Sequence, residues 1–177
     1  MNKLMLFFSV LLSLSISADL KSDLEKQINP LMDKVIEWRH DIHQNPELSN
    51  REYRTARKIE AHLRSLDIKV QTKIAYTGVV GLIEGDLPGP TIALRADMDA
   101  LPVVEKTGLP FASKDKTKYL GQTVGIMHAC GHDAHVAILM GVAEFLAENK
   151  DQLKGKSCLF SNRLKKGLQR EKMVELK

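Results

Sequence analysis

The segment with the clearest potential for chemistry is residues 128–135, with the sequence HACGHDAH. Three histidines and a thiol within eight residues are hard to explain by packing alone. Cys130 and His132 flank Gly131, which can adopt positive φ and so form a tight turn that directs both side chains inward. Since a thiolate and a neutral imidazole are good ligands for a borderline-soft divalent ion, the pattern favours a metal site.

Three other interpretations of this cluster stay open. Cys130 could form a disulfide with Cys158 in an oxidising compartment, and His128 and His135 could be hydrogen-bonded structural histidines. The whole segment could also be a redox site. A metal site explains more of these residues at once than a disulfide does.

A second polar cluster, residues 95–99 (RADMD), directly follows a predicted strand. The carboxylates of Asp97 and Asp99, with Arg95 beside them, can bind a cation or orient a metal-bound histidine. A pair of aspartates at this spacing also commonly caps turns, so both interpretations remain. Both polar clusters fall just past a predicted strand, where α/β folds keep their sites.

Two helices are predicted before the strands. Apolar residues from Leu24 to Ile42 recur at steps of three and four, which indicates one helix that Pro46 ends. Residues 49–52 (SNRE) fit a capping box and predict a second helix. Its expected buried face comprises Tyr53, Ala56, Ile59, Leu63 and Leu66.

The hydrophobic pattern then changes to that of strands. Strands are predicted near residues 68–70, 79–83 and 91–96, with a turn at residues 86–90 (DLPGP). Helical spacing returns at residues 136–148, and residues 156–160 fit one more short strand. Alternating helices and strands predict an α/β fold with a layered sheet.

The composition is that of a globular protein of at most one domain. The chain has 177 residues, of which 44% are hydrophobic and 27% charged, and this argues against disordered, collagen-like and coiled-coil classes. Residues 154–177 carry eight Lys or Arg and two Glu, a net charge of +6. The whole chain has a net charge of +4, so the rest of the chain is slightly acidic. The basicity is therefore confined to a tail without interleaved aromatic residues, and we expect no nucleic-acid partner.

The first eighteen residues are typical of a signal peptide. Lys3 precedes an apolar run over residues 4–14, and small residues follow up to Ala18. The run is shorter than the ~20 residues that a membrane-spanning helix needs. We therefore expect an exported protein, periplasmic or secreted, with no membrane association after cleavage.

Four segments together resemble the amidohydrolase branch of the M20 metallopeptidases. That branch includes hippurate hydrolases, N-acyl-amino-acid amidohydrolases and hydrolases of auxin conjugates. The segments occur in the same order as in the family: residues 38–49 (WRHDIHQNPELS), 89–102 (GPTIALRADMDALP), 107–110 (TGLP) and 127–135 (MHACGHDAH).

The resemblance implies the N-terminal part of a zinc-peptidase-like catalytic domain. Such an enzyme uses two divalent metals (zinc, manganese or cobalt) to cleave the amide bond of N-acyl amino acids or peptide-like amides. Cys130 and His132 match metal ligands of the family, and Asp99 matches a carboxylate near the site. The resemblance also implies that Asp97, His128 and His135 contact the ligands or the substrate, and that intact relatives form dimers.

The sequence departs from the family after residue 155. The family's general base lies in a Glu-Glu-Gly motif, but residues 163–167 read RLKKG here, and the lid or dimerisation domain is absent. A frameshift explains this, since codons for residues 159–166 exist that encode Glu-Glu-Gly in another frame. We therefore expect a signal peptide (1–18), a partial catalytic domain (19–155) and an aberrant basic tail (156–177). The sequence predicts a truncated and inactive amidohydrolase, or alternatively a non-catalytic metal-binding or interaction fragment.

Overall fold

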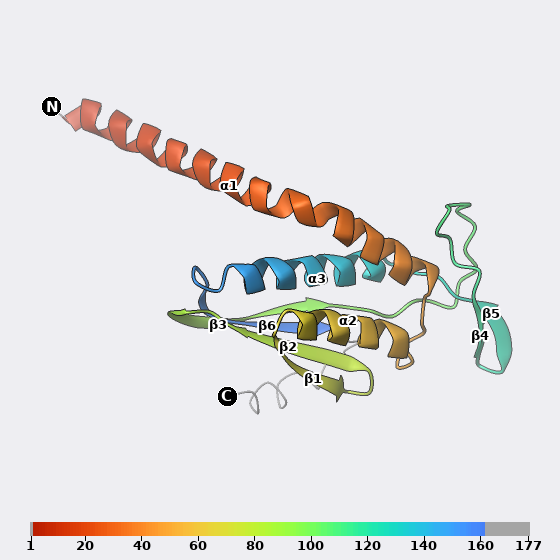
Figure 1. The fold of residues 1–177 in the computed structure, drawn as a ribbon. Helices are drawn as coiled ribbons and strands as arrows, with labels where there is room; N and C mark the ends of the chain where they lie inside the picture. The colour runs from red at the N-terminus through yellow and green to blue at the C-terminus, as the bar shows by residue number, and fades with distance from the viewer. Residues whose placement is uncertain (1, 162–177) are drawn as a thin grey trace. The chain divides into compact units, whose positions relative to one another are not determined.

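The computed structural model describes the backbone of residues 2–161 and the side chains of residues 21–161. Residues 162–177, which include most of the basic tail and the expected position of the general base, lie outside this description. The helices are α1 (Asn2–Gln44), α2 (Tyr53–Ser65) and α3 (His132–Glu148) (Figure 1). The strands are β1 (Lys69–Ile74), β2 (Gly78–Glu84), β3 (Leu87–Ala96), β4 (Lys116–Tyr119), β5 (Gln122–Gly125) and β6 (Lys154–Ser161).

The chain divides into two units, at residues 1–34 and 35–177. The first unit is helical and includes the predicted signal peptide, whose cleavage stays a prediction. Within the described part of the chain, no helix combines the length and the apolar character that are needed to cross a membrane. The candidate site lies wholly in the second unit.

The second unit is built on a four-stranded sheet in the order β1-β2-β6-β3. β1 and β2 are antiparallel, as are β2 and β6, whereas β3 and β6 are parallel. α2 and α3 lie on the same face of this sheet (Figure 1). The α/β class is therefore confirmed, and the strand predicted at residues 156–160 is β6.

One apolar core joins the two helices to the sheet. Ile59 and Leu63 of α2 and Met140 of α3 pack on strand residues that include Val79 and Leu159. Gly141 lets α3 approach α1 closely, because a Cβ there would lie 2.8 Å from Cγ2 of Val35. The core fixes the N-terminal end of α3, where the candidate site lies.

The predicted capping box of α2 is wrong, and another carboxylate caps the helix. Glu47 accepts hydrogen bonds from the backbone N–H groups of Arg54 and Thr55, at 2.9 and 2.8 Å. The predicted cap, Ser49, instead donates its hydroxyl to Asp99. Tyr53, expected on the buried face, is 58% exposed because α2 turns Thr55, Ile59 and Leu63 toward the sheet.

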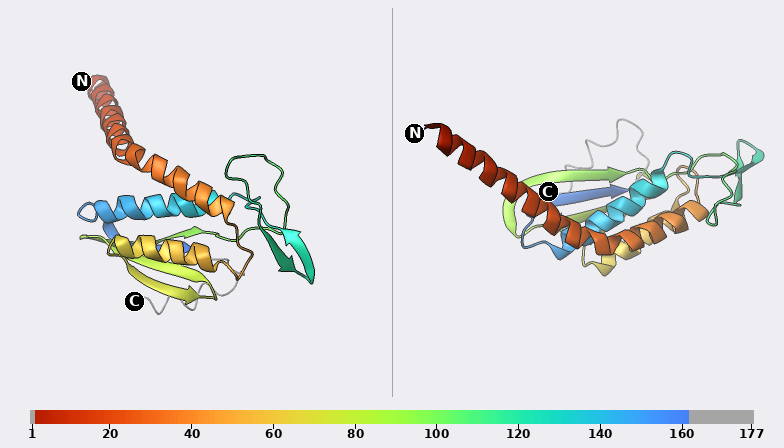
Figure 2. Two further views of the ribbon diagram at one scale, coloured as in Figure 1. Left: turned by 45° about the vertical axis from the view of Figure 1, so that its right-hand side comes forward. Right: turned by 90° about the horizontal axis from the view of Figure 1, so that it is seen from above.

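The turn predicted at residues 86–90 is also wrong in part, because β3 begins at Leu87 and runs through both prolines. β3 is an edge strand that pairs only with β6 among the described strands (Figure 2). Proline is tolerated on an edge strand since its missing N–H faces no neighbour there. The polar segment after residue 114, for which we predicted no strand, forms the hairpin β4–β5.

One edge of β3 pairs with no strand of the described residues, and this predicts concentration-dependent self-association. Ile92 is 54% exposed on this edge strand, and an unpaired edge with an apolar side chain is a template for pairing. We expect Ile92→Lys to reduce association, measured by sedimentation velocity over a concentration series. Ile138→Lys is the control, because Ile138 is 56% exposed but lies on α3. An equal effect of both substitutions would rule out pairing through the edge.

Candidate metal-binding site

The candidate ligands lie in the turn that leads into α3. Gly131 caps this helix with φ 80°, as the sequence predicts, and His132 is the first helical residue. Cys130 is exposed, whereas Cys158 in β6 is buried, and both thiols are free, so the alternative of a disulfide is not realised. Backbone hydrogen bonds between Met127 and Leu101, at 2.9 and 3.1 Å, hold the turn beside the segment that follows β3.

Asp99 holds the ring of His132. Nδ1 of His132 lies 2.8 Å from the backbone oxygen of Asp99 and 3.1 Å from its carboxylate Oδ1. The other carboxylate oxygen, Oδ2, accepts a hydrogen bond of 2.5 Å from the hydroxyl of Ser49. These contacts occupy Nδ1 and leave Nε2 of His132 for a ligand. The donor chemistry of Nε2 and the Cys130 thiol suits zinc or a similar ion.

His128 is 4% exposed and lies just before the turn. Its two ring nitrogens are buried, and neither has a hydrogen-bond partner among the described residues. Burial lowers the pKa of His128 to about 4, partly offset by the negative charge of Asp133. The imidazole is therefore neutral near pH 7.

The remaining predicted residues lie around the turn or apart from it. His135 is exposed on α3, with its ring centroid 5.7 Å from that of His132. Asp97 forms an ion pair with Arg95 instead of contacting His132. Among the described residues, no group of three or more His, Cys, Asp or Glu side chains is arranged to hold a metal.

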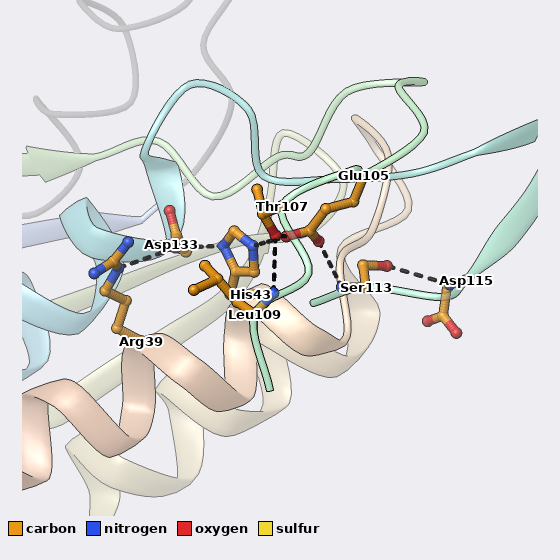
Figure 3. Close-up of polar contacts among 8 residues, drawn as sticks. All are labelled: Arg39, His43, Glu105, Thr107, Leu109, Ser113, Asp115 and Asp133. Carbon is orange, nitrogen blue, oxygen red and sulfur yellow. Dashed lines mark hydrogen bonds and ion pairs between the residues drawn. The ribbon is translucent and has the colours of Figure 1, made fainter. Parts of the chain in front are cut away.

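A buried ion-pair cluster that the sequence analysis missed supports this turn. His43 of α1 has Nδ1 2.9 Å from Oδ2 of Asp133 and Nε2 3.1 Å from Oε1 of Glu105 (Figure 3). Arg39 donates a further bond of 3.3 Å to the same oxygen of Asp133. The side chains of His43, Asp133 and Glu105 are at most 6% exposed. The cluster joins α1, the first turn of α3 and the loop after β3.

The geometry pairs His43 with two carboxylates. Each ring nitrogen faces a carboxylate oxygen, at 2.9 Å for Asp133 and 3.1 Å for Glu105. Burial alone would raise the pKa of Asp133, but hydrogen bonds from His43 and from the backbone N–H of Ala134 lower it overall. The cluster thus consists of one imidazole ring between two carboxylates.

Glu105 closes the loop that follows β3. Its Oε1 also accepts the hydroxyl of Thr107, and its Oε2 accepts the backbone N–H of Ser113, both at 2.5 Å (Figure 3). Burial opposes ionisation, yet these bonds and the one from His43 hold the pKa of Glu105 below its ordinary value of 4.5. Local sequence patterns do not indicate these contacts, because Glu105 stands alone in a loop and His43 lies in a helical pattern.

Glu52 is a buried carboxylate whose pKa is shifted in the opposite direction to that of Glu105. It is fully buried, accepts a hydrogen bond of 2.6 Å from the hydroxyl of Thr77, and has an Oε1 without a partner among the described residues. Burial raises its pKa above the ordinary value of 4.5. Glu52 and Glu105 therefore respond to pH with opposite signs.

The sequence matches one family model, described as peptidase family M20/M25/M40, over residues 93–161. The matched residues contain the end of β3, the hairpin β4–β5, the candidate turn, α3 and β6.

Similar proteins include enzymes of two kinds. The chain is 47% identical to thermostable carboxypeptidase 2 of Saccharolobus solfataricus over 77% of this chain and 33% of that protein. It is 50% identical to N-acetyl-L-cysteine deacetylase of Bacillus subtilis over 76% of this chain and 29% of that protein. The crystal structure of the YXEP protein of Bacillus subtilis, described as a dinuclear metal-binding peptidase from the M20 family, superposes with a TM-score of 0.66. That match has 40% identity and covers 75% of this chain and 35% of the other.

The two buried glutamates predict opposite effects of amidation. Glu105→Gln replaces one of two accepting oxygens with a donating amide group, so at least one hydrogen bond is lost and we expect a loss of about 1–3 kcal/mol of stability at pH 7. The lowered pKa of Glu105 contributes stability above about pH 4.5 that is lost as the pH falls, so the variant should lose less stability on acidification.

Glu52→Gln is the matched control. Because the pKa of Glu52 is raised, its ionisation costs stability as the pH rises above about 4.5, and the neutral amide removes that cost. We expect unchanged or higher stability at pH 7, measured by urea unfolding at pH 7 and pH 4. Equal losses in both variants would contradict the assigned roles.

Proposed function

Because this chain belongs to peptidase family M20/M25/M40, we propose that residues 35–161 contribute to a metal-dependent site that hydrolyses the amide bond of N-acyl amino acids. The chain spans about a third of the length of the curated relatives it matches. The proposal therefore concerns what these residues add to such a site.

The observation that carries the proposal is the contact between Asp99 and His132. A carboxylate that binds Nδ1 of a histidine fixes its ring and raises the basicity of Nε2, which is the usual arrangement behind a metal-binding histidine. Ser49 holds the same carboxylate from its other oxygen, so the ring orientation is set before any ligand binds. Cys130, two residues earlier and exposed, is the second donor.

The reaction would divide between metal and protein. A divalent metal would polarise the amide carbonyl and activate water for attack. The residues of this chain would bind and orient: Cys130 and His132 as donors, and Asp99 as the residue that positions His132. His43, through Asp133 and Glu105, would hold the turn and the neighbouring loop in place.

The proposed substrates follow from what the relatives have in common. A carboxypeptidase and an N-acetylcysteine deacetylase both release an amino acid from an acyl or peptidyl group. We therefore favour small amides of amino acids, including hippurate-like compounds. Export to the periplasm or beyond, based on residues 1–18, is part of the same proposal.

We further propose that the 177-residue chain does not catalyse this reaction by itself. The described residues offer two donors at the turn, and none of their acidic side chains completes a group of three around a metal. The alternative function is a non-catalytic metal-binding fragment. It is favoured if the chain binds zinc without any turnover.

Zinc titration by calorimetry tests the proposed ligands. Cys130→Ser should abolish binding, because a single imidazole is a weak ligand. Asp99→Asn should weaken binding by about 10–100-fold, the usual cost of removing the partner of a metal-bound histidine. Cys158→Ala, which removes the buried thiol in β6, should leave the isotherm unchanged. Unchanged binding in Cys130→Ser would refute the site.

Activity assays test the second part of the proposal. With zinc, manganese or cobalt added, we expect no release of glycine from hippurate and no deacetylation of N-acetyl amino acids. The Cys130→Ser variant gives the background rate. Turnover above that background would show that this chain completes a catalytic site.

A further inference from the structure

The hairpin β4–β5 ends in a turn whose residues are unfavourable for folding alone. The hairpin is a two-stranded sheet that stands apart from the four-stranded sheet (Figure 1 and Figure 2). Its two turn residues, Leu120 and Gly121, have positive φ of 48° and 79°. Such a turn favours Asn-Gly, and a leucine at positive φ is strained. Since Leu120 is also 86% exposed, folding by itself disfavours leucine at this position.

Cationic groups surround this apolar tip. Residues 114–122 contain three exposed lysines and a single aspartate. Lys116 and Lys118 lie on one face of β4, where their partners across the hairpin are glycine and threonine. Arg51 donates a hydrogen bond of 2.9 Å to the backbone oxygen of Lys118 and so holds a further cation at the hairpin. Because Tyr119 is 41% exposed, the tip combines positive charge with exposed apolar surface.

The shape of this surface favours a lipid bilayer over a protein partner. A projecting turn of two residues can enter the headgroup layer without a complementary groove, whereas a protein partner would have to provide one. Leucine and tyrosine suit the interface of a bilayer, and lysine stems reach along it while their amines stay in water. Anionic headgroups supply the charge that is complementary to the lysines.

We propose, independently of the metal site, that the tip of β4–β5 docks the protein on an anionic membrane surface. Tyr119 and Leu120 enter the headgroup layer, and Lys116 and Lys118 bind the anionic headgroups. The contact is peripheral, since only a two-residue turn enters the lipid. It revises the expectation, drawn from residues 1–18, that the chain has no membrane association after cleavage of the signal peptide.

The test reads the hairpin directly in the full 177-residue chain. The natural chain has one tryptophan, Trp38, so Tyr119→Trp places a second reporter beside the tip. We expect nitroxide-labelled lipid to quench the added fluorescence in vesicles that contain phosphatidylglycerol, and not in vesicles of phosphatidylcholine alone. Trp38 gives the background. A reporter at this position separates the hairpin from other segments that could contact lipid, including residues 1–18 and the basic tail.

Two further changes, made in the Tyr119→Trp chain, should raise the lipid concentration that is needed for half-maximal quenching. Leu120→Asn supplies the residue that the turn favours, so we expect unchanged or higher stability in urea but about tenfold weaker binding. Lys116→Gln combined with Lys118→Gln should weaken binding roughly 25-fold, because each lysine near an anionic surface contributes about fivefold.

The matched control is Tyr76→Asn in the same chain. Tyr76 is 76% exposed, has a φ of 88° and lies in the turn between β1 and β2. It therefore shares the exposure and the backbone conformation of Leu120, but belongs to another hairpin. Its replacement should leave the quenching unchanged.

Three outcomes would overturn the inference. Quenching that does not exceed the Trp38 background would do so, and would favour an acidic protein as the partner of these lysines. Equal quenching by both kinds of vesicle would exclude recognition of anionic lipid. An effect of Tyr76→Asn as large as that of Leu120→Asn would show that the tip of β4–β5 has no special role.

Discussion

The contact of the His43 ring with two buried carboxylates is the interaction on which the arrangement of the site depends. Asp133 belongs to the first turn of α3, and Glu105 belongs to the loop after β3, so one side chain ties both to α1. A buried charge is tolerated when it is paired and fully hydrogen-bonded. Removal of one partner leaves the other charge buried without compensation, which destabilises the fold. The turn that contains Cys130 therefore depends on residues of α1 and of the loop after β3.

Around this cluster, buried polar groups differ in how well they are satisfied. Every oxygen of Glu105 accepts a hydrogen bond, whereas Glu52 and His128 have buried atoms without partners among the described residues. Folding alone would select against the latter pair. A protein retains such residues where another requirement outweighs stability, and unsatisfied groups near a candidate site are thus informative about function.

The sequence allowed the α/β class, the positive φ of Gly131 and the family to be predicted, because hydrophobic periodicity and short motifs are local signals. It did not allow the cap of α2 to be predicted, since Glu47 precedes that helix by several residues and reaches it through a turn. The contacts of His43 were missed for a similar reason. Its partners lie 62 and 90 residues away in the sequence. No local pattern around Glu105 or Asp133 indicates that either contacts His43.

The strand order has a consequence for how the chain folds as it is synthesised. β6 lies between β2 and β3, and it is the last described strand to leave the ribosome. Until it emerges, β3 has no described strand to pair with. Long-range pairing of this kind delays folding. The nascent chain therefore exposes β3 and its apolar residues throughout the synthesis of α3, when chaperone binding would matter most.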